Sequence, residues 1–323
     1  MKTIHTIAAA LTLALGLGNG ASAETWDIAT PYPEGNFHTQ NIIQFTKDVD
    51  AATNGALKIT VHPANSLIAH PEIKNSVRSG TIPMGEFLLG RLSNENPLFE
   101  LDMLPFVVSG YDDAREMWDA SRPEIQELLG RQNLRVLFSV PWPNNGIYVN
   151  SEINSTEDLR GLRFRTYNTT TDRFAELVNA VPTQVEVSDI AQAFSTGRVQ
   201  GMITSAATGV AVSAWDFVDR YYAVQSFLGK NVVVVNEKMF QALPEDVRKA
   251  VLTAAAEAET RGWALSQEND AKMAGVLAEH GITVEAPSEA LQAGLLKVGE
   301  TMLEEWLARA DAGGGSIVER LKN

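Results

Sequence analysis

Cysteine is absent from the 323 residues of this chain. Without thiolates the chain has no disulfide scaffold, no cysteine-based metal site, no cysteine nucleophile and no cysteine to carry a lipid anchor. Packing must therefore stabilise the folded state, and a hydrophobic content of 45% is sufficient for that. At this length we expect two domains rather than one.

Long apolar runs are also lacking. The stretch Ile4–Leu17 follows Lys2 and falls short of the roughly 20 apolar residues that a transmembrane helix needs, and no later stretch comes closer. Because Ala21-Ser22-Ala23 supplies a small-x-small cleavage site, we interpret residues 1–23 as a secretory signal that is cut after Ala23. We expect a soluble, exported protein with no segment inserted in a membrane.

Positive charge is scarce as well. The chain has 26 Lys and Arg residues against 40 Asp and Glu residues, which gives a formal net charge of −14, and loss of Lys2 with the signal makes it −15. A surface this acidic repels phosphate backbones and anionic headgroups. We therefore expect neither nucleic acid nor a membrane surface as a partner.

Catalytic and metal-binding signatures are missing from the sequence. There is no Gly-x-Ser-x-Gly elbow, His-Glu-x-x-His helix, phosphate loop or Gly-x-Gly-x-x-Gly turn. The five histidines have no metal-ligand spacing, and the acidic pairs Asp112-Asp113, Glu157-Asp158 and Glu304-Glu305 fit helix starts or solvated faces. We predict no metal, no cofactor and no enzymatic activity. An exported hydrolase that uses dispersed carboxylates is an alternative.

Strand-like and helix-like segments alternate along the whole mature chain, which predicts an α/β fold with sheets covered on both faces. The longest helical pattern, Pro244–His280, would be roughly 50 Å long and should cross both domains. Asp311–Ser316 should be a flexible stretch before a short helix at Ile317–Leu321. The predicted strands are 25–29, 57–62, 82–88, 134–140, 162–166 and 231–235, and the other predicted helices are 38–53, 71–79, 112–130, 169–180 and 188–196.

The most informative segment is Asp158–Thr166, because it places two arginines on one face of a predicted strand. Leu162 and Phe164 alternate there with Arg163 and Arg165. An unpaired charge inside a covered sheet costs several kcal/mol. Arg165 therefore either pairs with a carboxylate of the protein or awaits one from a ligand, which its planar guanidinium would hold through two parallel hydrogen bonds.

Several ordered motifs resemble the solute-binding proteins of tripartite ATP-independent periplasmic (TRAP) transporters, and the resemblance covers essentially the whole mature chain. The chain departs from the usual family pattern at Asp189 and Gln200, which we interpret as packing variants. The motifs are His62-Pro63 followed by Leu67, Leu104-Pro105-Phe106, Asp158–Arg165, Ser188-Asp189 leading to Ala193-Phe194, Thr196–Gly201 and Leu243–Val247.

This resemblance implies a two-lobed, type II-like periplasmic binding protein in which each lobe has a mixed or parallel sheet flanked by helices. Lobe I would comprise 24–143, completed by about 230–271 and 298–323. Lobe II would comprise 144–229, completed by about 272–297, and a long helix would span both lobes. The partners would be a small organic acid and the small and large membrane subunits of a permease.

The resemblance also implies a binding site. Arg165 matches the family arginine that grips the ligand carboxylate. Asn145 stands where sialic-acid binders have a second arginine and Thr204 where they have an asparagine, so a monocarboxylate such as a sugar acid, an aromatic acid or a hydroxy or keto acid fits better than a polyanion. The further candidates are Trp215, Asn168, Glu86, Phe87 and Thr30, with Trp142 as another aromatic wall.

One alternative within transport remains open. A binding protein of another importer class, such as an ATP-driven one, would share the hinged architecture but not the unbroken helix from Pro244 to His280. A break near Gly262 would favour that class.

Overall fold

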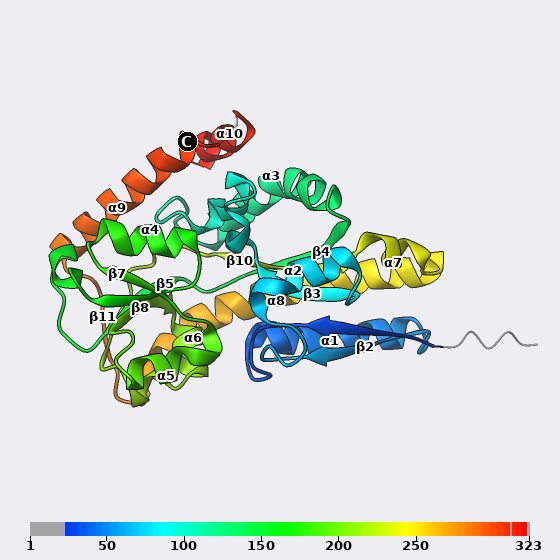
Figure 1. The fold of residues 1–323 in the computed structure, drawn as a ribbon, viewed down its shortest axis with the longest axis horizontal. Coiled ribbons are helices and arrows are strands. Elements are labelled where there is room, and N and C mark those ends of the chain that lie inside the picture. Colours follow the sequence, from blue (N-terminus) through cyan, green and yellow to red (C-terminus); the bar gives the residue numbers. More distant parts are fainter. Residues whose placement is uncertain (1–22, 311, 322–323) are drawn as a thin grey trace, which may run out of the picture.

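Two mixed β-sheets, each flanked by helices, form the two lobes of the computed structural model, which describes residues 23–310 and 312–321 (Figure 1). The predicted signal lies outside these residues, apart from Ala23. The first sheet has the order β2-β1-β3-β10-β4, with β1 Glu24–Ala29, β2 Leu57–His62, β3 Met84–Leu88, β4 Leu134–Pro141 and β10 Lys230–Asn236. The second has the order β11-β9-β5-β8-β6-β7, with β5 Asn145–Val149, β6 Arg163–Thr166, β7 Val181–Gln184, β8 Gly201–Ser205, β9 Arg220–Tyr222 and β11 Thr283–Glu285.

Helices cover both sheets. None of those in the described part is both long enough and apolar enough to cross a membrane. The α-helices are α1 Phe37–Ala52, α2 His70–Ser79, α3 Tyr111–Gly130, α4 Thr169–Leu177, α5 Ile190–Ser195, α6 Ala206–Ala211, α7 Glu237–Ala242, α8 Glu245–Glu279, α9 Glu289–Leu307 and α10 Ala312–Leu321. The short 3₁₀ helices are η1 Leu89–Leu92, η2 Pro97–Met103, η3 Thr156–Leu159, η4 Val187–Asp189 and η5 Ala214–Asp216.

The four consecutive valines of β10 form the buried strand that the sequence predicts. All four are at most 2% exposed, because helices cover both faces of the sheet at this strand. β10 runs antiparallel to both β3 and β4, whereas β1 runs parallel to β2 and β3. The sheet is therefore mixed.

Two chain segments connect the sheets side by side. One joins β4 to β5, and the other joins β9 to β10. The Trp142 N–H donates to the Gly229 carbonyl at 2.7 Å, and the Ser226 N–H donates to the Asn145 carbonyl at 3.2 Å. These paired connections place Trp142 and Asn145 between the lobes.

Helix α8 is the third crossing, and its 35 residues confirm the predicted long helix. It packs against α1 and β4 of the first lobe and against α6 and β11 of the second. The helix continues without a break through Gly262, where a Cβ would lie 2.7 Å from Asn41 Nδ2 and closer still to Val140. Glycine is therefore needed at this position for close packing rather than for a bend.

Two glycines of α8 differ in their surroundings, so replacing each by alanine should change stability in opposite directions. We expect Gly262→Ala to lower the free energy of unfolding by about 1–3 kcal/mol, because the added methyl group overpacks the contact with Val140 and Asn41. Gly275→Ala, on the same helix with open space around it, should raise it by about 0.5–1 kcal/mol through helix propensity. Urea unfolding followed by circular dichroism measures both. A stabilised Gly262→Ala variant would contradict the packing argument.

The prediction of a flexible stretch at Asp311–Ser316 is wrong for the residues that the structure describes. α10 begins at Ala312 and includes the three consecutive glycines. A Cβ on Gly314 would lie 2.9 Å from Trp306 Cη2, so the absence of a side chain lets α10 pack closely on this buried indole. A packing requirement, not flexibility, accounts for glycine at Gly314.

Candidate ligand-binding site

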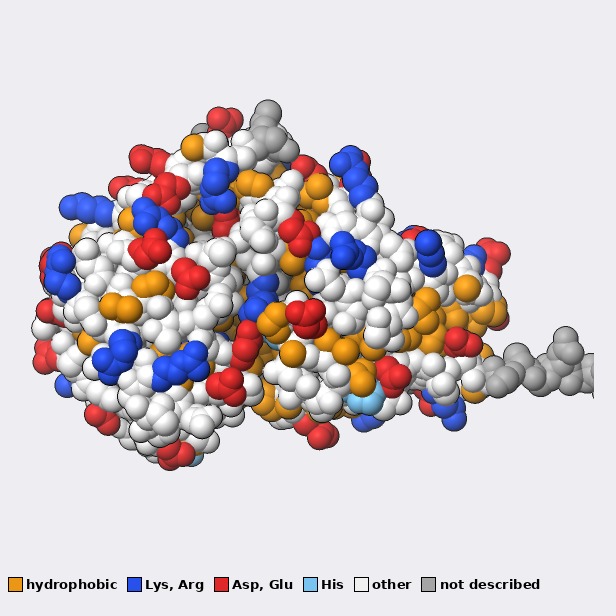
Figure 2. All heavy atoms as spheres, in the orientation of Figure 1, with side chains coloured by type: hydrophobic (Ala, Val, Ile, Leu, Met, Phe, Trp, Pro, Cys, Tyr) orange, Lys and Arg blue, Asp and Glu red, His pale blue; other side chains and the backbone are white. Residues whose placement is uncertain are grey.

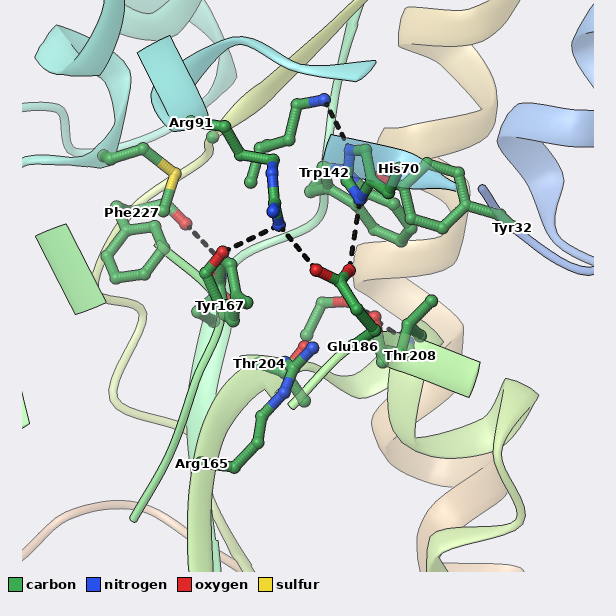
Figure 3. A pocket seen from close by; sticks show the side chains of 16 residues that line it. Tyr32, His70, Arg91, Trp142, Arg165, Tyr167, Glu186, Thr204, Thr208 and Phe227 are labelled. Atoms are coloured by element: carbon green, nitrogen blue, oxygen red, sulfur yellow. Dashed lines mark hydrogen bonds and ion pairs between the residues drawn. The ribbon is translucent and has the colours of Figure 1, made fainter. Parts of the chain in front are cut away.

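A cavity lies between the two sheets, next to the paired connections (Figure 3). The space inside it that atoms do not fill, including its opening to solvent, is about 530 Å³. Side chains from both lobes line it, which is the arrangement expected for a site that closes around a small molecule. The labelled lining residues are Tyr32, His70, Arg91, Trp142, Arg165, Tyr167, Glu186, Thr204, Thr208 and Phe227.

Arg165 is the buried cation of the cavity. It lies one residue before the end of β6 and is 4% exposed. Its Nε donates to the Val185 carbonyl at 2.9 Å, and its guanidinium carbon lies 4.5 Å from the centre of the Tyr167 ring. No carboxylate among the described residues forms an ion pair with it. Burial lowers the pKa of Arg165 to about 10, so the side chain is cationic at neutral pH.

Glu186 is a carboxylate in the same cavity, and it lies two residues after the end of β7. Its Oε1 lies 3.1 Å from Arg91 Nη1 and its Oε2 lies 3.4 Å from His70 Nδ1. Burial raises the pKa of Glu186, but the hydrogen bond from His70 and the charge of Arg91 outweigh burial and lower it to about 2. Arg91 also donates to the Tyr167 carbonyl at 2.9 Å, so this cluster bridges the lobes.

His70 is held as a neutral donor. The Leu88 N–H donates to His70 Nε2 at 3.3 Å, so that nitrogen carries the lone pair and the ring proton lies on Nδ1, facing Glu186. Burial lowers the pKa of His70. The lining charges are thus two cations, Arg91 and Arg165, and one anion, Glu186.

Aromatic side chains form one wall of the cavity. The Tyr32 and Trp142 rings meet edge to face with their centres 4.9 Å apart. Asn231 holds both, because its Oδ1 accepts from the Tyr32 hydroxyl at 3.2 Å and from Trp142 Nε1 at 3.0 Å. Its Nδ2 donates to Glu86 Oε1 at 2.9 Å. The wall is therefore supported by a polar network behind it.

Among the residues predicted as ligand contacts, the structure brings Arg165, Asn145 and Thr204 to the cavity, together with Trp142. Asn145 Nδ2 donates to the Phe227 carbonyl at 3.1 Å, which leaves its Oδ1 as an acceptor. Asn145 on β5 and Thr204 on β8 lie near each other because these two strands pair antiparallel.

The other predicted contacts lie elsewhere. Glu86 and Thr30 are buried behind the aromatic wall, where the Thr30 hydroxyl donates to Glu86 at 2.5 Å, and Phe87 is a core residue of β3. Asn168 caps α4 by accepting from the Thr171 N–H at 2.9 Å. Trp215 stacks on His280 with ring centres 4.0 Å apart and packs against the core of the second lobe.

Sequence reasoning missed several lining residues: Tyr32, His70, Arg91, Tyr167, Glu186, Thr208 and Phe227. One signal was available for Glu186. It follows a strand that pairs parallel with β6, and the carboxyl ends of parallel strands meet at one edge, where Arg165 also lies. No group of three or more metal-ligating side chains occurs within the described ranges.

The surface around this site carries charges of both signs. Figure 2 shows acidic and basic side chains interspersed over one face, without a continuous basic patch on that face. The cationic groups of the cavity are thus a local feature of an acidic chain. Distant surface charges are screened beyond about 8 Å at physiological salt, so they do not oppose anion binding at Arg165.

Comparisons with known proteins agree with this geometry. A family model described as bacterial extracellular solute-binding protein, family 7, matches residues 28–308. The crystal structure of DctP7 from Bordetella pertussis, an extracytoplasmic solute receptor binding pyroglutamic acid, is 39% identical, has a TM-score of 0.91 and covers 93% of this chain and 100% of its own.

Two further relatives extend the comparison. A marine metagenome TRAP solute-binding protein specific for pyroglutamate is 35% identical with a TM-score of 0.91, covering 93% of this chain and 99% of that one. The sialic acid-binding periplasmic protein SiaP of Vibrio cholerae is 22% identical over 292 residues, covering 89% of this chain and 90% of SiaP.

Proposed function

We propose, since the chain belongs to family 7 of the bacterial extracellular solute-binding proteins, that it captures a small organic monocarboxylate of the pyroglutamate type between its two lobes. It would act by binding and release, without bond chemistry, and deliver the acid to the small and large membrane subunits of a TRAP permease. Its place of action would be the periplasm, after cleavage behind Ala23.

The observation that carries the proposal is the buried Arg165 guanidinium, which has no carboxylate partner among the described residues and lies at the cavity. A buried unpaired cation is costly, and a ligand carboxylate removes that cost. Its Nε is already used by the Val185 carbonyl, so the two terminal nitrogens are available to a carboxylate as a bidentate pair.

The rest of the cavity suits a small, flat acid. Tyr32 and Trp142 offer an apolar wall, while Asn145 and Thr204 offer polar groups in the same cavity. A five-membered lactam with one carboxylate presents the same combination of an apolar ring and a few polar atoms. Similarity at 35–39% identity to receptors whose described ligand is pyroglutamate supports this choice.

The proposed mechanism is hinged closure. Lobe I would comprise 24–143 with about 230–271 and 298–323, and lobe II would comprise 144–229 with about 272–297. The ligand would bind Arg165 of lobe II in an open form, and contacts from Tyr32 and Arg91 of lobe I would form only on closure. Such differential contacts are what shift a population from open to closed.

A thermal-shift screen tests the proposal. We expect L-pyroglutamate at 100 times its dissociation constant to stabilise the protein by about 2.7 kcal/mol, because it binds the folded form alone. For a chain of this size that raises the melting temperature by several degrees. Uronates, short hydroxy acids and C4 dicarboxylates serve as comparison ligands. No shift with any monocarboxylate, against a clear shift with a neutral sugar or amino acid, would refute the proposal.

A further inference from the structure

We propose that Glu186 selects the ligand: it accepts a hydrogen bond from an N–H or O–H group of the acid, and it excludes acids that carry a second carboxylate. This inference rests on the proposed function and narrows its ligand class to monoanions with a donor group on the side remote from Arg165.

The charge balance of the cavity sets the charge of the ligand. Among the described lining residues, Arg91 and Arg165 are cations and Glu186 is the one anion, while the tautomer fixed by Leu88 keeps His70 neutral. One ligand carboxylate therefore brings the lining to neutrality. A second would leave an excess negative charge in a buried site, which is unfavourable.

A second buried carboxylate, Glu86, lies behind the aromatic wall. Its carboxylate is 1% exposed and takes hydrogen bonds from Thr30 and Asn231, with His38 Nδ1 at 3.3 Å from Oε1. Burial lowers the pKa of His38, so this histidine supplies no compensating cation. Glu86 and His38 thus lie outside the lining and supply no cation that could pair with a second ligand carboxylate.

Glu186 is held in place and keeps acceptor capacity. Arg91 occupies one direction at Oε1 and the His70 Nδ1–H one direction at Oε2, and each carboxylate oxygen accepts more than one hydrogen bond. Figure 3 shows the carboxylate between Arg91 and His70 on one side and Arg165 on the other. A molecule bound to Arg165 therefore lies next to a fixed, charged acceptor.

One alternative acceptor in the cavity is the Asn145 amide oxygen, since its Nδ2 donates to the Phe227 carbonyl. This group is neutral, so it accepts a weaker hydrogen bond than a carboxylate and does not repel an anion. Glu186 differs from Asn145 in its charge. Both roles proposed for Glu186, accepting a hydrogen bond from the ligand and excluding a dianion, depend on that charge, so one charge-removing substitution tests both.

The experiment combines a change in the protein with a change in the ligand. L-Pyroglutamate is compared by calorimetry with 5-oxotetrahydrofuran-2-carboxylate, in which a ring oxygen replaces the lactam N–H, and with glutarate, which has two carboxylates. In the unmodified protein we expect the lactone to bind at least 10-fold more weakly than the lactam, and glutarate at least 100-fold more weakly.

In Glu186→Gln the preference for the lactam over the lactone should fall to 3-fold or less, and glutarate binding should improve at least 10-fold. The matched control is Ser93→Ala, which removes an interlobe hydrogen bond of 2.5 Å to the Thr169 hydroxyl without changing charge. It should weaken all three ligands by the same factor and leave their ratios unchanged.

Glu186→Asp provides a second test if the glutamine variant does not fold. It retains the charge on a shorter side chain, so the lactam preference should fall while glutarate stays excluded. Equal ratios in the unmodified protein and in Glu186→Gln would overturn the inference and leave Glu186 as an interlobe contact only. Failure of every monocarboxylate to bind the unmodified protein would instead overturn the proposed function on which the inference rests.

Discussion

Replacing Arg165 by methionine should weaken ligand binding by roughly 30-fold or more while leaving the ligand-free protein at least as stable as the original. Removing one partner of a buried, hydrogen-bonded charge pair costs about 2–5 kcal/mol, which corresponds to a loss of roughly 30-fold to several thousand-fold in affinity. The ligand affinity of Arg165→Lys should lie between those of Arg165→Met and the unmodified protein, because lysine retains a charge but not the two parallel hydrogen bonds.

The stability half of this prediction follows from the pKa. Burial lowers the pKa of Arg165 to about 10, well below the ordinary arginine value, so the unfolded state binds the proton more tightly. The penalty is fully present below pH 10, is on the order of 3 kcal/mol, and disappears as the pH rises from 10 toward the pKa of an unburied arginine.

Calorimetric titration and thermal unfolding at pH 7, without and with ligand, measure both halves. The matched control is Arg163→Met, two residues earlier on the same strand but exposed, where Nε donates to the Gly197 carbonyl. It should retain full affinity. Unchanged affinity in Arg165→Met, or a melting temperature several degrees lower without ligand, would show that Arg165 has a structural role instead.

Replacing Asn231 by leucine should destabilise the protein by about 3–4 kcal/mol and weaken ligand binding as well. The change leaves the Tyr32 hydroxyl and Trp142 Nε1 without their shared acceptor and removes one donor from the buried Glu86 carboxylate. Each buried polar group left unsatisfied costs about 1–3 kcal/mol, and members of one network lose more together than separately.

Denaturant unfolding of Asn231→Leu is best compared with two other variants. Trp142→Phe removes one donor but keeps the acceptor, so it should cost about 1–2 kcal/mol. Asn75→Leu, on an exposed position of α2, should change stability by less than about 0.5 kcal/mol. If Asn231→Leu lowers the free energy of unfolding by no more than Trp142→Phe does, Asn231 does not act as a shared partner of the three side chains.

The alternation of elements and the long crossing helix could be predicted from the sequence because both depend on local pattern. β10 illustrates the limit. Its valines predict a buried strand, but its direction depends on which strands it joins, and these lie far away in the sequence. The helical glycines before Ile317 were predicted as flexible because the contact that calls for glycine at Gly314, with Trp306, is tertiary.

In the candidate site, too, local pattern predicts some features, whereas others depend on tertiary contacts. Strand alternation separates Arg165 from Phe164, and the resemblance to the TRAP family predicts a ligand role for Arg165. The position of Trp215 depends on its stacking with His280 at the end of α8, which no spacing reveals. Arg91 and His70 reach Glu186 only because the lobes meet there, so sequence position alone does not mark them.

The central place of β10 has a consequence for how the chain acquires its shape. β3 and β4 lie on either side of a strand that begins at Lys230, so a ribosome must complete more than two thirds of the polypeptide before the first sheet can close. A nascent chain that cannot complete a sheet early would remain unfolded for longer, which is the state that a translocation channel accepts. A fragment truncated before β10 would leave β3 and β4 each with an unpaired edge, and such edges promote aggregation.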